Sequence, residues 1–563
     1  MKNFSKPIPF FLLNFTLIFN LLVFWSIRSM WSGIIALTGK PVPYILCLIL
    51  TLTTLLTTSC CIYKKYPFIL SVWNAILNLL FLVLNGYMIS VTLDSLPYFL
   101  KEFSYAVAFT AIIALCIFLI FYSSAYRIFQ KKWLQPVFIL TLFAIGFLSV
   151  YDISLTNGID KTPVVYAVED TYQITFTTQA KGEAWVVIDG VEYNETFSGG
   201  RKIENKIHKI TVPMEELDSA NSYTVYTRAM ILHGPYESLQ GSTISETYSW
   251  KGVNTDDGLH YYVFSDNHLS EKSSAAACSY WGDKLDFLIS VGDTANWIDD
   301  ETELSHFLYL ASDITKGEIP VIYARGNHET YGTRFADYHN YVGADNENFY
   351  YTFRLQNIWG IVLDMGVDHE DTYVEYAGTA KYDSYRKEQT LFLDSVLENA
   401  ESEFLADGID YRIGICHIPL AFSKASDSLL TYKKEWISRL NQMQLSVMYS
   451  GHLHDLMFVD AAIEADTILT LLPEFSGKEE NNEQYITTGA TFPSILVSKR
   501  GTKQSRLDTE NVFDKFFIGV AASIEKDDTI LKYTNESGEI IETISPWFKN
   551  VQYGNEIRIK NVR

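Results

Sequence analysis

The sequence predicts three regions of different fold class: a bundle of five transmembrane helices (residues 1–151), a small all-β sandwich (152–254) and an α/β region (255–563). Five long apolar stretches predict the bundle, and alternation of apolar and polar residues predicts the sandwich. Five short apolar runs, each the length of a buried strand, predict the α/β region. The chain of 563 residues is 48% hydrophobic and 20% charged. It is therefore too apolar for a disordered protein and too long for one compact domain.

Each of the five N-terminal apolar stretches reaches the roughly 20 residues that a bilayer-spanning helix needs. The first could instead be a cleaved signal peptide, but no small-x-small site follows it, so we expect it to be retained. The region has no histidine, and its only acidic residues, Asp94 and Glu102, fall in a predicted outer loop. A membrane anchor is therefore the simplest interpretation. The predicted spans are Pro7–Ile27, Pro43–Tyr63, Pro67–Leu93, Phe103–Tyr126 and Trp133–Tyr151.

The distribution of lysine and arginine predicts the orientation of these spans. With the N-terminus inside, seven basic residues lie on the cytoplasmic side and three on the outer side, as the positive-inside rule requires. An odd number of spans then places the chain after Tyr151 outside the cytoplasm. We therefore predict a multi-pass cell-membrane protein whose larger part is extracytoplasmic.

Charge and cysteine content narrow the class of protein further. Residues 1–150 carry a net charge of +8 and the remainder −30, so the exported part lacks the positive field that holds polyanions. We expect no nucleic acid as a stable partner. Only Cys278 and Cys416 lie outside the membrane segments, which predicts no disulfide framework and favours a bacterial surface over a eukaryotic secretory product.

Residues 162–253 show period-two alternation separated by turn signals, which predicts a small antiparallel sandwich with no helix between its strands. It has no cluster of metal-ligand residues, so we expect it to act as a spacer or as a wall beside a functional site in another region. The polar stretch Lys251–Gly258 is the expected linker. The strand-like runs are Tyr172–Thr177, Ala184–Ile188, Ile207–Val212, Tyr223–Ala229 and Thr243–Trp250.

Five short apolar runs between Tyr261 and Asp455 each end in residues that bind metals. Because open α/β sheets hold their sites at the carboxyl ends of the strands, we expect these residues to meet at one edge of one sheet. The runs end in Asp266-Asn267-His268, Gly292-Asp293, Gly326-Asn327-His328-Glu329, His417-Ile418-Pro419 and Gly451-His452-Leu453-His454.

These residues offer a mixed set of oxygen and nitrogen donors. Carboxylates come from Asp266 and Asp293, an amide oxygen from Asn327, and imidazoles from His268, His417, His452 and His454. The set suits two borderline divalent or trivalent ions. No thiolate joins it, which disfavours a structural zinc site of the cysteine type.

In this order, the five blocks resemble the signature motifs of calcineurin-like metallophosphoesterases. The resemblance implies a four-layer α/β/β/α sandwich with two metal ions, either Mn, Fe or Zn. It also implies that Asp266, His268 and His454 bind one ion, that Asn327, His417 and His452 bind the other, and that Asp293 bridges both. His328 would be the catalytic residue, a non-ligand near the phosphoryl oxygen and the leaving group.

The arrangement of a β module before the motifs is similar to purple acid phosphatases, whose N-terminal domain is fibronectin type III-like. The helix-like run Lys387–Leu393 and a late strand pair, Phe517–Val520 and Thr529–Tyr533, extend this resemblance. Two positions depart from it. Purple acid phosphatases have a tyrosine three residues after the bridging aspartate to bind ferric iron, whereas residue 296 is Asn. The first block also carries His268, where purple acid phosphatases lack a histidine ligand.

The resemblance implies a metal-dependent hydrolase of phosphate esters, either a phosphatase or a phosphodiesterase. The alternative is a non-catalytic surface protein that binds or senses phosphate-bearing polymers. Asn296 and Trp297 either line the substrate mouth or pack against their neighbours. Glu329 is expected beside the site rather than in it. The charged run Asp368–Asp371 follows the apolar run Ile358–Asp364 and could reach the edge of the site, but a charge run is more often a solvated loop.

Overall fold

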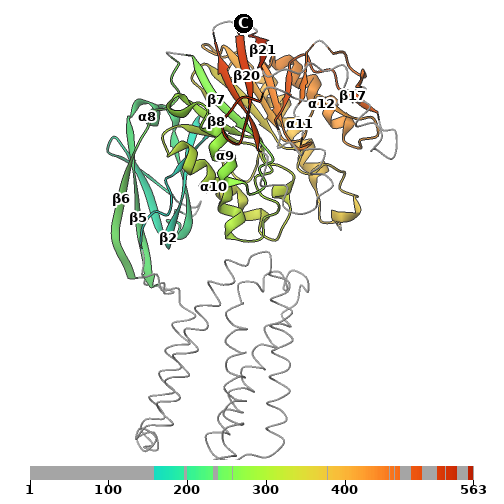
Figure 1. Ribbon diagram of the computed structural model, residues 1–563. Helices are drawn as coiled ribbons and strands as arrows, with labels where there is room; N and C mark the ends of the chain where they lie inside the picture. The colour runs from blue at the N-terminus through green and yellow to red at the C-terminus, as the bar shows by residue number, and fades with distance from the viewer. Residues whose placement is uncertain are drawn as a thin grey trace, which may run out of the picture. The chain divides into compact units, whose positions relative to one another are not determined.

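The computed structural model describes residues 157–561, apart from 196–199, 233–238, 256–257, 377, 455–456, 462, 470–483, 498–516, 526–527 and 542–555. The described residues belong to one compact unit, Tyr151–Arg563 (Figure 1). The five predicted membrane spans lie outside them. Within the described part of the chain, no helix has the length and apolar character needed to cross a bilayer.

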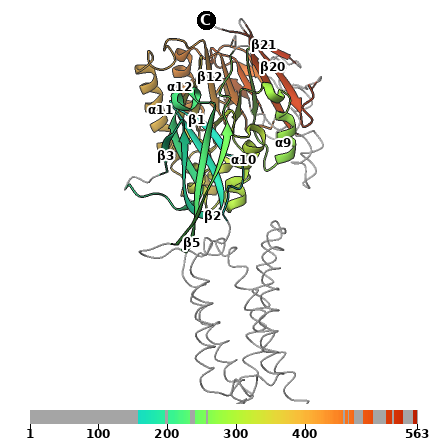
Figure 2. The same cartoon turned by 90° about the vertical axis from the view of Figure 1, so that its left-hand side faces the viewer.

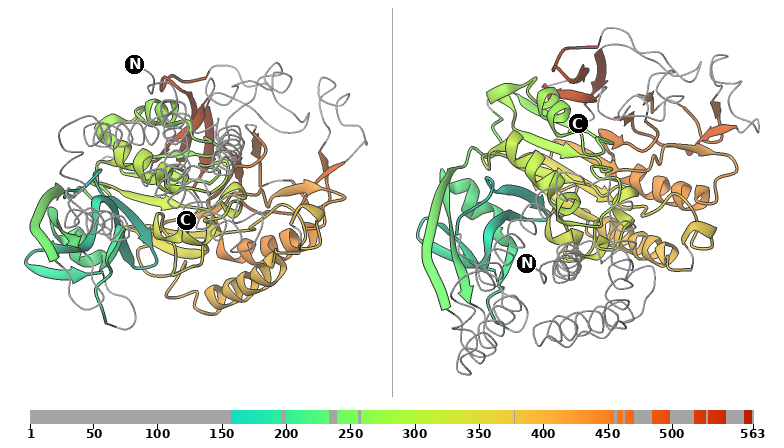
Figure 3. Two further views of the ribbon diagram at one scale, coloured as in Figure 1. Left: turned by 90° about the horizontal axis from the view of Figure 1, so that it is seen from below. Right: turned by 60° about the horizontal axis from the view of Figure 1, so that its bottom comes forward.

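The larger sheet contains twelve of the described strands, ten of them in the order β21-β20-β19-β7-β8-β9-β1-β2-β5-β6. Strands β7, β8 and β9 run parallel to one another, and β1 runs parallel to β9. Figure 3 shows the teal and green strands at one end of this sheet and the red strands at the other. The strands are β1 (Val164–Val168), β2 (Thr171–Ile188), β3 (Val191–Asn194), β4 (Asn205–Pro213), β5 (Ser222–Leu232), β6 (Leu239–Ser249), β7 (Leu259–Phe264), β8 (Phe287–Ser290), β9 (Pro320–Tyr323), β19 (Ile518–Ile524), β20 (Asp528–Asn535) and β21 (Glu556–Lys560).

A second sheet of six described strands has the order β10-β11-β12-β14-β18-β15 and is parallel from β11 to β18. Its strands are β10 (Tyr351–Leu355), β11 (Ile358–Leu363), β12 (Tyr411–Cys416), β14 (Val447–Ser450), β15 (Met457–Val459) and β18 (Ser494–Leu496). A small sheet beside it contains β13 (Phe422–Lys424), β16 (Ile468–Leu469) and β17 (Tyr485–Thr487).

Alternating side chains of the second sheet pack into two different hydrophobic cores. In β14, Val447 and Tyr449 join the core shared with the larger sheet, whereas Met448 joins a core on the opposite face. The opposite face is covered by α11 (Tyr382–Glu398) and α12 (Leu430–Leu440), while α9 (Glu271–Cys278) and α10 (Glu301–Thr315) pack on the larger sheet. Figure 2 shows these two helix pairs on opposite sides of the strands. The α/β prediction for this region is therefore confirmed, with two sheets between two helical layers.

The β module differs from the prediction in three respects. Strand β2 covers two predicted runs in one long strand, and a short helix, α8 (Met214–Ser219), lies between β4 and β5 where none was predicted. Its six residues are too few for a helical period to be visible in the sequence. The module also shares a sheet with the α/β region, because β1 pairs with β9. Its fibronectin-like character and the boundary at residue 254 remain predictions.

Candidate metal centre

The predicted ligands meet where the two sheets face each other. Strands β7, β8 and β9, which precede Asp266, Asp293 and Asn327, belong to the larger sheet, whereas β12 and β14, which precede the histidine ligands, belong to the smaller one. The prediction of one sheet edge is therefore wrong. A strand that is buried on both faces is a continuous apolar run. Its sequence has no alternation of polar and apolar residues that would show which sheet it joins.

The ligands lie on turns with an unusual backbone. Asp266, His268, Asp293, His452 and His454 all have positive φ angles, between 42° and 76°. Non-glycine residues rarely adopt this left-handed conformation, and it costs on the order of 1–3 kcal/mol at each position. Such a concentration is typical of functional sites, where the surrounding structure holds the side chains in a fixed arrangement.

Two glycines make room for the carboxylates. A Cβ atom on Gly326 would collide with the Asp293 carboxylate, and a Cβ atom on Gly451 would collide with Ser265 and the Asp266 carboxylate. Each glycine therefore allows a turn from one strand to approach the carboxylate that follows another strand.

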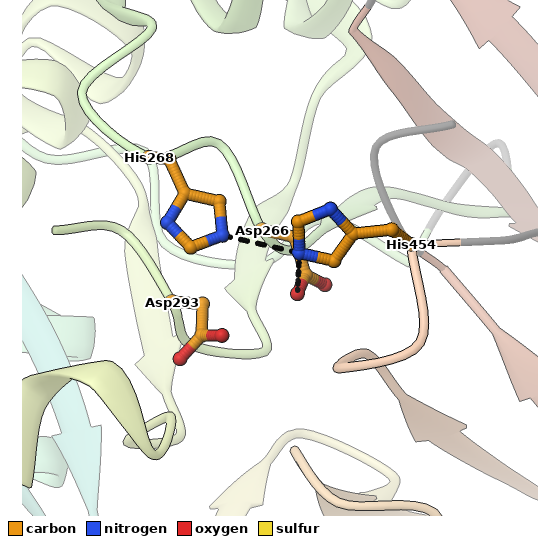
Figure 4. Close-up of side chains that lie close together, drawn as sticks. All are labelled: Asp266, His268, Asp293 and His454. Carbon is orange, nitrogen blue, oxygen red and sulfur yellow. Dashed lines mark hydrogen bonds and ion pairs between the residues drawn. The ribbon is translucent and has the colours of Figure 1, made fainter. Parts of the chain in front are cut away.

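The first cluster contains Asp266, His268, Asp293 and His454, whose ligand atoms all lie within 4.8 Å of one another (Figure 4). The Nε2 atoms of His268 and His454 are 3.2 Å apart, and His454 Nε2 is 3.4 Å from Asp266 Oδ1. Two imidazole nitrogens and two carboxylates thus converge on one small volume, as a cation requires.

The second cluster contains Asp293, His417 and His452, again with ligand atoms within 4.8 Å of one another. His417 Nε2 lies 3.1 Å from Asp293 Oδ2 and makes no hydrogen bond of good geometry. Its Nδ1 atom, 2.6 Å from the Val291 carbonyl, donates to that oxygen, which leaves the Nε2 lone pair for a metal. The Asn327 Oδ1 atom, 2.9 Å from His452 Nδ1, is a further oxygen that could bind a metal in this cluster.

The electrostatics of the clusters favour a bound cation. Burial opposes ionisation of Asp293, but the His417 imidazole outweighs it and lowers the pKa of that carboxyl to about 2. Burial lowers the pKa of His268 and of His452 to about 4, so both are uncharged at neutral pH, as ligands must be. Burial also opposes protonation of His417, yet Asp293 and Asp266 raise its pKa to about 10. The carboxylates therefore attract positive charge, which a metal ion can supply in place of the proton.

His328 lies at the open side of the clusters. Its Nδ1 atom is 2.8 Å from the Asn296 carbonyl, its Nε2 atom is 3.9 Å from Asp293 Oδ2, and its side chain is 37% exposed. The carbonyl fixes the ring so that Nε2 faces the site. Trp297, next to Asn296, is 47% exposed, which favours the interpretation that this segment borders the mouth.

Two further acidic residues lie near the ligands. The buried Glu329 carboxylate accepts hydrogen bonds from the backbone N–H groups of Asp293, Thr294, Ala295 and Gly326. It therefore connects the turn after β8 to the turn after β9. This position beside the ligands is the one that the sequence predicts. For Asp368 the sequence favours a solvated loop over the alternative, a position at the edge of the site. Asp368 is 34% exposed, but its carboxylate lies 3.9 Å from His452 Nε2, at the edge of the second cluster.

Sequence reasoning missed a buried ion pair next to the turn that carries Asn327. Arg325 precedes the Gly326-Asn327-His328 turn, and Asp364 follows β11 directly. Their side chains pair at 2.7 Å. An arginine next to a ligand-bearing turn and an aspartate at the end of an apolar strand were the available signals.

The donor set fits two ions that share Asp293. One cluster offers two imidazoles with carboxylate oxygens, and the other offers two imidazoles, the shared carboxylate and the Asn327 amide oxygen. This mixed set of oxygens and nitrogens suits borderline metals such as Mn²⁺, Fe²⁺ or Zn²⁺.

Comparison with known proteins agrees with this geometry. Residues 259–456 match the family model of the calcineurin-like phosphoesterases, so the chain contains a calcineurin-like phosphoesterase domain. With its cluster of metal-binding residues, this domain is a metal-dependent phosphoric ester hydrolase, as the motifs predict. No curated protein matches the sequence.

Several solved structures resemble the chain at low identity. A purple acid phosphatase from yellow lupin (Lupinus luteus) seeds has 13% identity and a TM-score of 0.42, covering 71% of this chain and 74% of its own. PhoD has 10% identity and a TM-score of 0.37, covering 71% and 92%. GAP50, the anchor in the inner membrane complex of Plasmodium, has 13% identity and a TM-score of 0.30, covering 52% and 89%.

Proposed function

We propose that the chain is a membrane-anchored phosphoesterase that uses two metal ions to hydrolyse phosphate esters outside the cytoplasm. The observation that carries the proposal is the position of Asp293, whose carboxylate belongs to both ligand clusters. A carboxylate shared in this way can hold two cations close together. A site for a single ion would not need it.

The proposed chemistry follows from charge. Two bound divalent ions would supply Lewis-acid stabilisation of the phosphoryl oxygens and would make water nucleophilic at neutral pH. His328 would carry a proton on Nε2 and give it to the departing oxygen, while the Asn296 carbonyl keeps the ring in place through Nδ1. Asp266 is oriented by the backbone N–H of His452, which donates to both of its oxygens.

Substitution of the shared carboxylate tests the two-metal site. Asp293→Asn and His417→Ala should each abolish hydrolysis when the purified chain is assayed against a panel of phosphate mono- and diesters with Mn²⁺, Zn²⁺ or Fe²⁺ supplied in turn. Asp283→Asn, at an exposed residue of the same region, is the matched control and should keep full activity. Activity of Asp293→Asn within about tenfold of the wild type would refute the proposal.

The extracytoplasmic location rests on the predicted spans and their basic loops, and it needs a separate test. Protease added to intact cells should remove residues 152–563 and leave the spans. Protection of that portion until the cells are lysed would overturn the proposed topology without affecting the proposed chemistry.

A further inference from the structure

The buried ion pair between Arg325 and Asp364 connects the two sheets beside the turn that carries Asn327. Arg325 Nε lies 2.9 Å from Asp364 Oδ2, and the terminal NH2 nitrogen lies 2.7 Å from the same oxygen. Both side chains are buried, with exposed fractions of 8% and 2%. Arg325 follows β9 in the larger sheet and Asp364 follows β11 in the smaller one.

Asp364 is itself held firmly by its neighbours. The Tyr385 hydroxyl donates to Oδ2 at 3.1 Å, and the backbone N–H of Gly366 donates to Oδ1 at 2.7 Å. The side-chain amide of Gln389, from α11, bonds both the N–H and the carbonyl of Asp364. The carboxylate is therefore a fixed point of the smaller sheet to which Arg325 can attach.

On the other side, Arg325 is only two residues from Asn327. The Arg325 guanidinium also stacks on Phe349, 4.2 Å from the ring centroid, which fixes the direction of its side chain. The Glu329 carboxylate accepts from the N–H of Gly326 and ties the turn to the loop after β8. The turn that carries Asn327 is thus held by Arg325 at its start and by Glu329 at its end.

We propose that Arg325 and Asp364 are a positioning pair that keeps Asn327 opposite His452, and that they control the affinity of the second metal cluster. The inference rests on the proposed two-metal function. The first cluster contains neither Asn327 nor His452, so the pair should affect the two clusters unequally. Loss of a residue that orients a metal ligand typically weakens metal binding about 10- to 100-fold.

Binding of Mn²⁺ to the full-length chain tests this inference. After equilibrium dialysis against increasing free Mn²⁺, bound metal is counted by mass spectrometry. The wild type should bind two ions. Arg325→Met and Asp364→Asn should each bind the first ion normally and the second about 10- to 100-fold more weakly. The double variant should be no weaker than either single one, and Arg325→Lys, which keeps the charge, should be intermediate.

A second buried ion pair provides the control. Lys433 and Asp427 pair at 2.9 Å on α12 and the segment before it, with exposed fractions of 7% and 16%. Lys433→Met and Asp427→Asn should lower thermal stability while both Mn²⁺ ions bind as in the wild type. Excess Mn²⁺ should restore turnover to Arg325→Met but not to Asp293→Asn.

Two results would overturn the inference: binding of both ions by Arg325→Met and Asp364→Asn within about threefold of the wild type, or equal weakening of both ions. If Arg325→Met fails to fold, Arg325→Lys and Asp364→Asn carry the same test. Binding of only one ion by the wild type would instead refute the proposed two-metal function.

Discussion

The Nδ1 atom of His417 lies 2.6 Å from the main-chain oxygen of Val291, so an imidazole from the smaller sheet is oriented by a carbonyl from the larger one. This contact directs the Nε2 atom of His417 towards Asp293. The backbone N–H of His452 makes a second connection of this kind when it donates to Asp266. Each ligand cluster therefore forms only when the two sheets are packed together, and metal binding should report on that packing.

Removal of the His328 imidazole should affect substrates according to their leaving groups. His328→Ala should lower kcat about 10²- to 10⁴-fold for an alkyl phosphate, whose leaving oxygen needs a proton. It should lower kcat much less for p-nitrophenyl phosphate, whose leaving group departs without one. His339→Ala is the control, because the Nδ1 atom of His339 also contacts a carbonyl, that of Ala336, but lies outside the two ligand clusters. An equal loss with both substrates would contradict the role of proton donor.

The Glu329 carboxylate should be essential for the stability of the turns around the site. Glu329→Gln keeps the size of the side chain but turns an amide NH2 towards backbone N–H groups that need an acceptor. The free energy of unfolding should fall by about 2–4 kcal/mol, measured by chemical denaturation. Glu303→Gln is the comparison, because Glu303 also accepts two backbone N–H bonds but in an exposed helix cap. A smaller loss for Glu329→Gln than for Glu303→Gln would show that the buried carboxylate is not needed.

The stability of the joint between the β module and the α/β region should depend on pH through Lys209. Its ammonium group contacts the carbonyls of His339 and Val342, and burial, which outweighs the favourable charge of Glu195, lowers its pKa to about 7. Between pH 7 and about 10.5 the unfolded chain holds this proton and the folded chain does not. The contribution of Lys209 to the free energy of unfolding should therefore rise with pH in this range, by at most about 1.4 kcal/mol per unit. His417, whose pKa is raised to about 10, contributes in the opposite sense, so the effect of Lys209 is seen as a difference between variants.

Thermal unfolding of the purified chain at a series of pH values checks this dependence. The difference in free energy of unfolding between the wild type and Lys209→Met should grow with pH, whereas Lys206→Met, at an exposed position of the same strand, should differ from the wild type by an amount that does not change with pH. A pH-independent difference for Lys209→Met would contradict the role of Lys209.

Much of the site could be predicted because each ligand follows an apolar run. The runs before Asp266, Asp293, Asn327, His417 and His452 all became strands, and the turns that end them bring the side chains together. The division between two sheets could not be predicted, since four of these strands are buried at every position and β7 at every position except His260. A buried strand shows no polar face from which its neighbours can be inferred.

The connection of the β module to the larger sheet could not be predicted for a similar reason. Strand β1 is five apolar residues, Val164–Val168, all buried, with no alternation to place it beside β9. The continuity of β2 depends on Gly182, where a Cβ atom would collide with the Arg228 carbonyl. Close approach of this kind is a tertiary contact that a single sequence does not reveal.

At residue 296 the sequence departs from the purple acid phosphatases. A tyrosinate bound to ferric iron produces a visible charge-transfer band, but this position is Asn, and its main-chain oxygen contacts His328. In the first ligand cluster, His268 offers an imidazole nitrogen where a tyrosine would offer a phenolate oxygen. Such a donor set should accept ordinary divalent ions, so the purified protein should be active with Mn²⁺ or Zn²⁺ and should show no purple colour after loading with iron. Visible absorption spectra and metal analysis of the protein as isolated provide the measurement. A purple protein with one tyrosinate-bound ferric ion per chain would mean that a distant tyrosine supplies the missing ligand, and the prediction of a site for ordinary divalent ions would then be wrong.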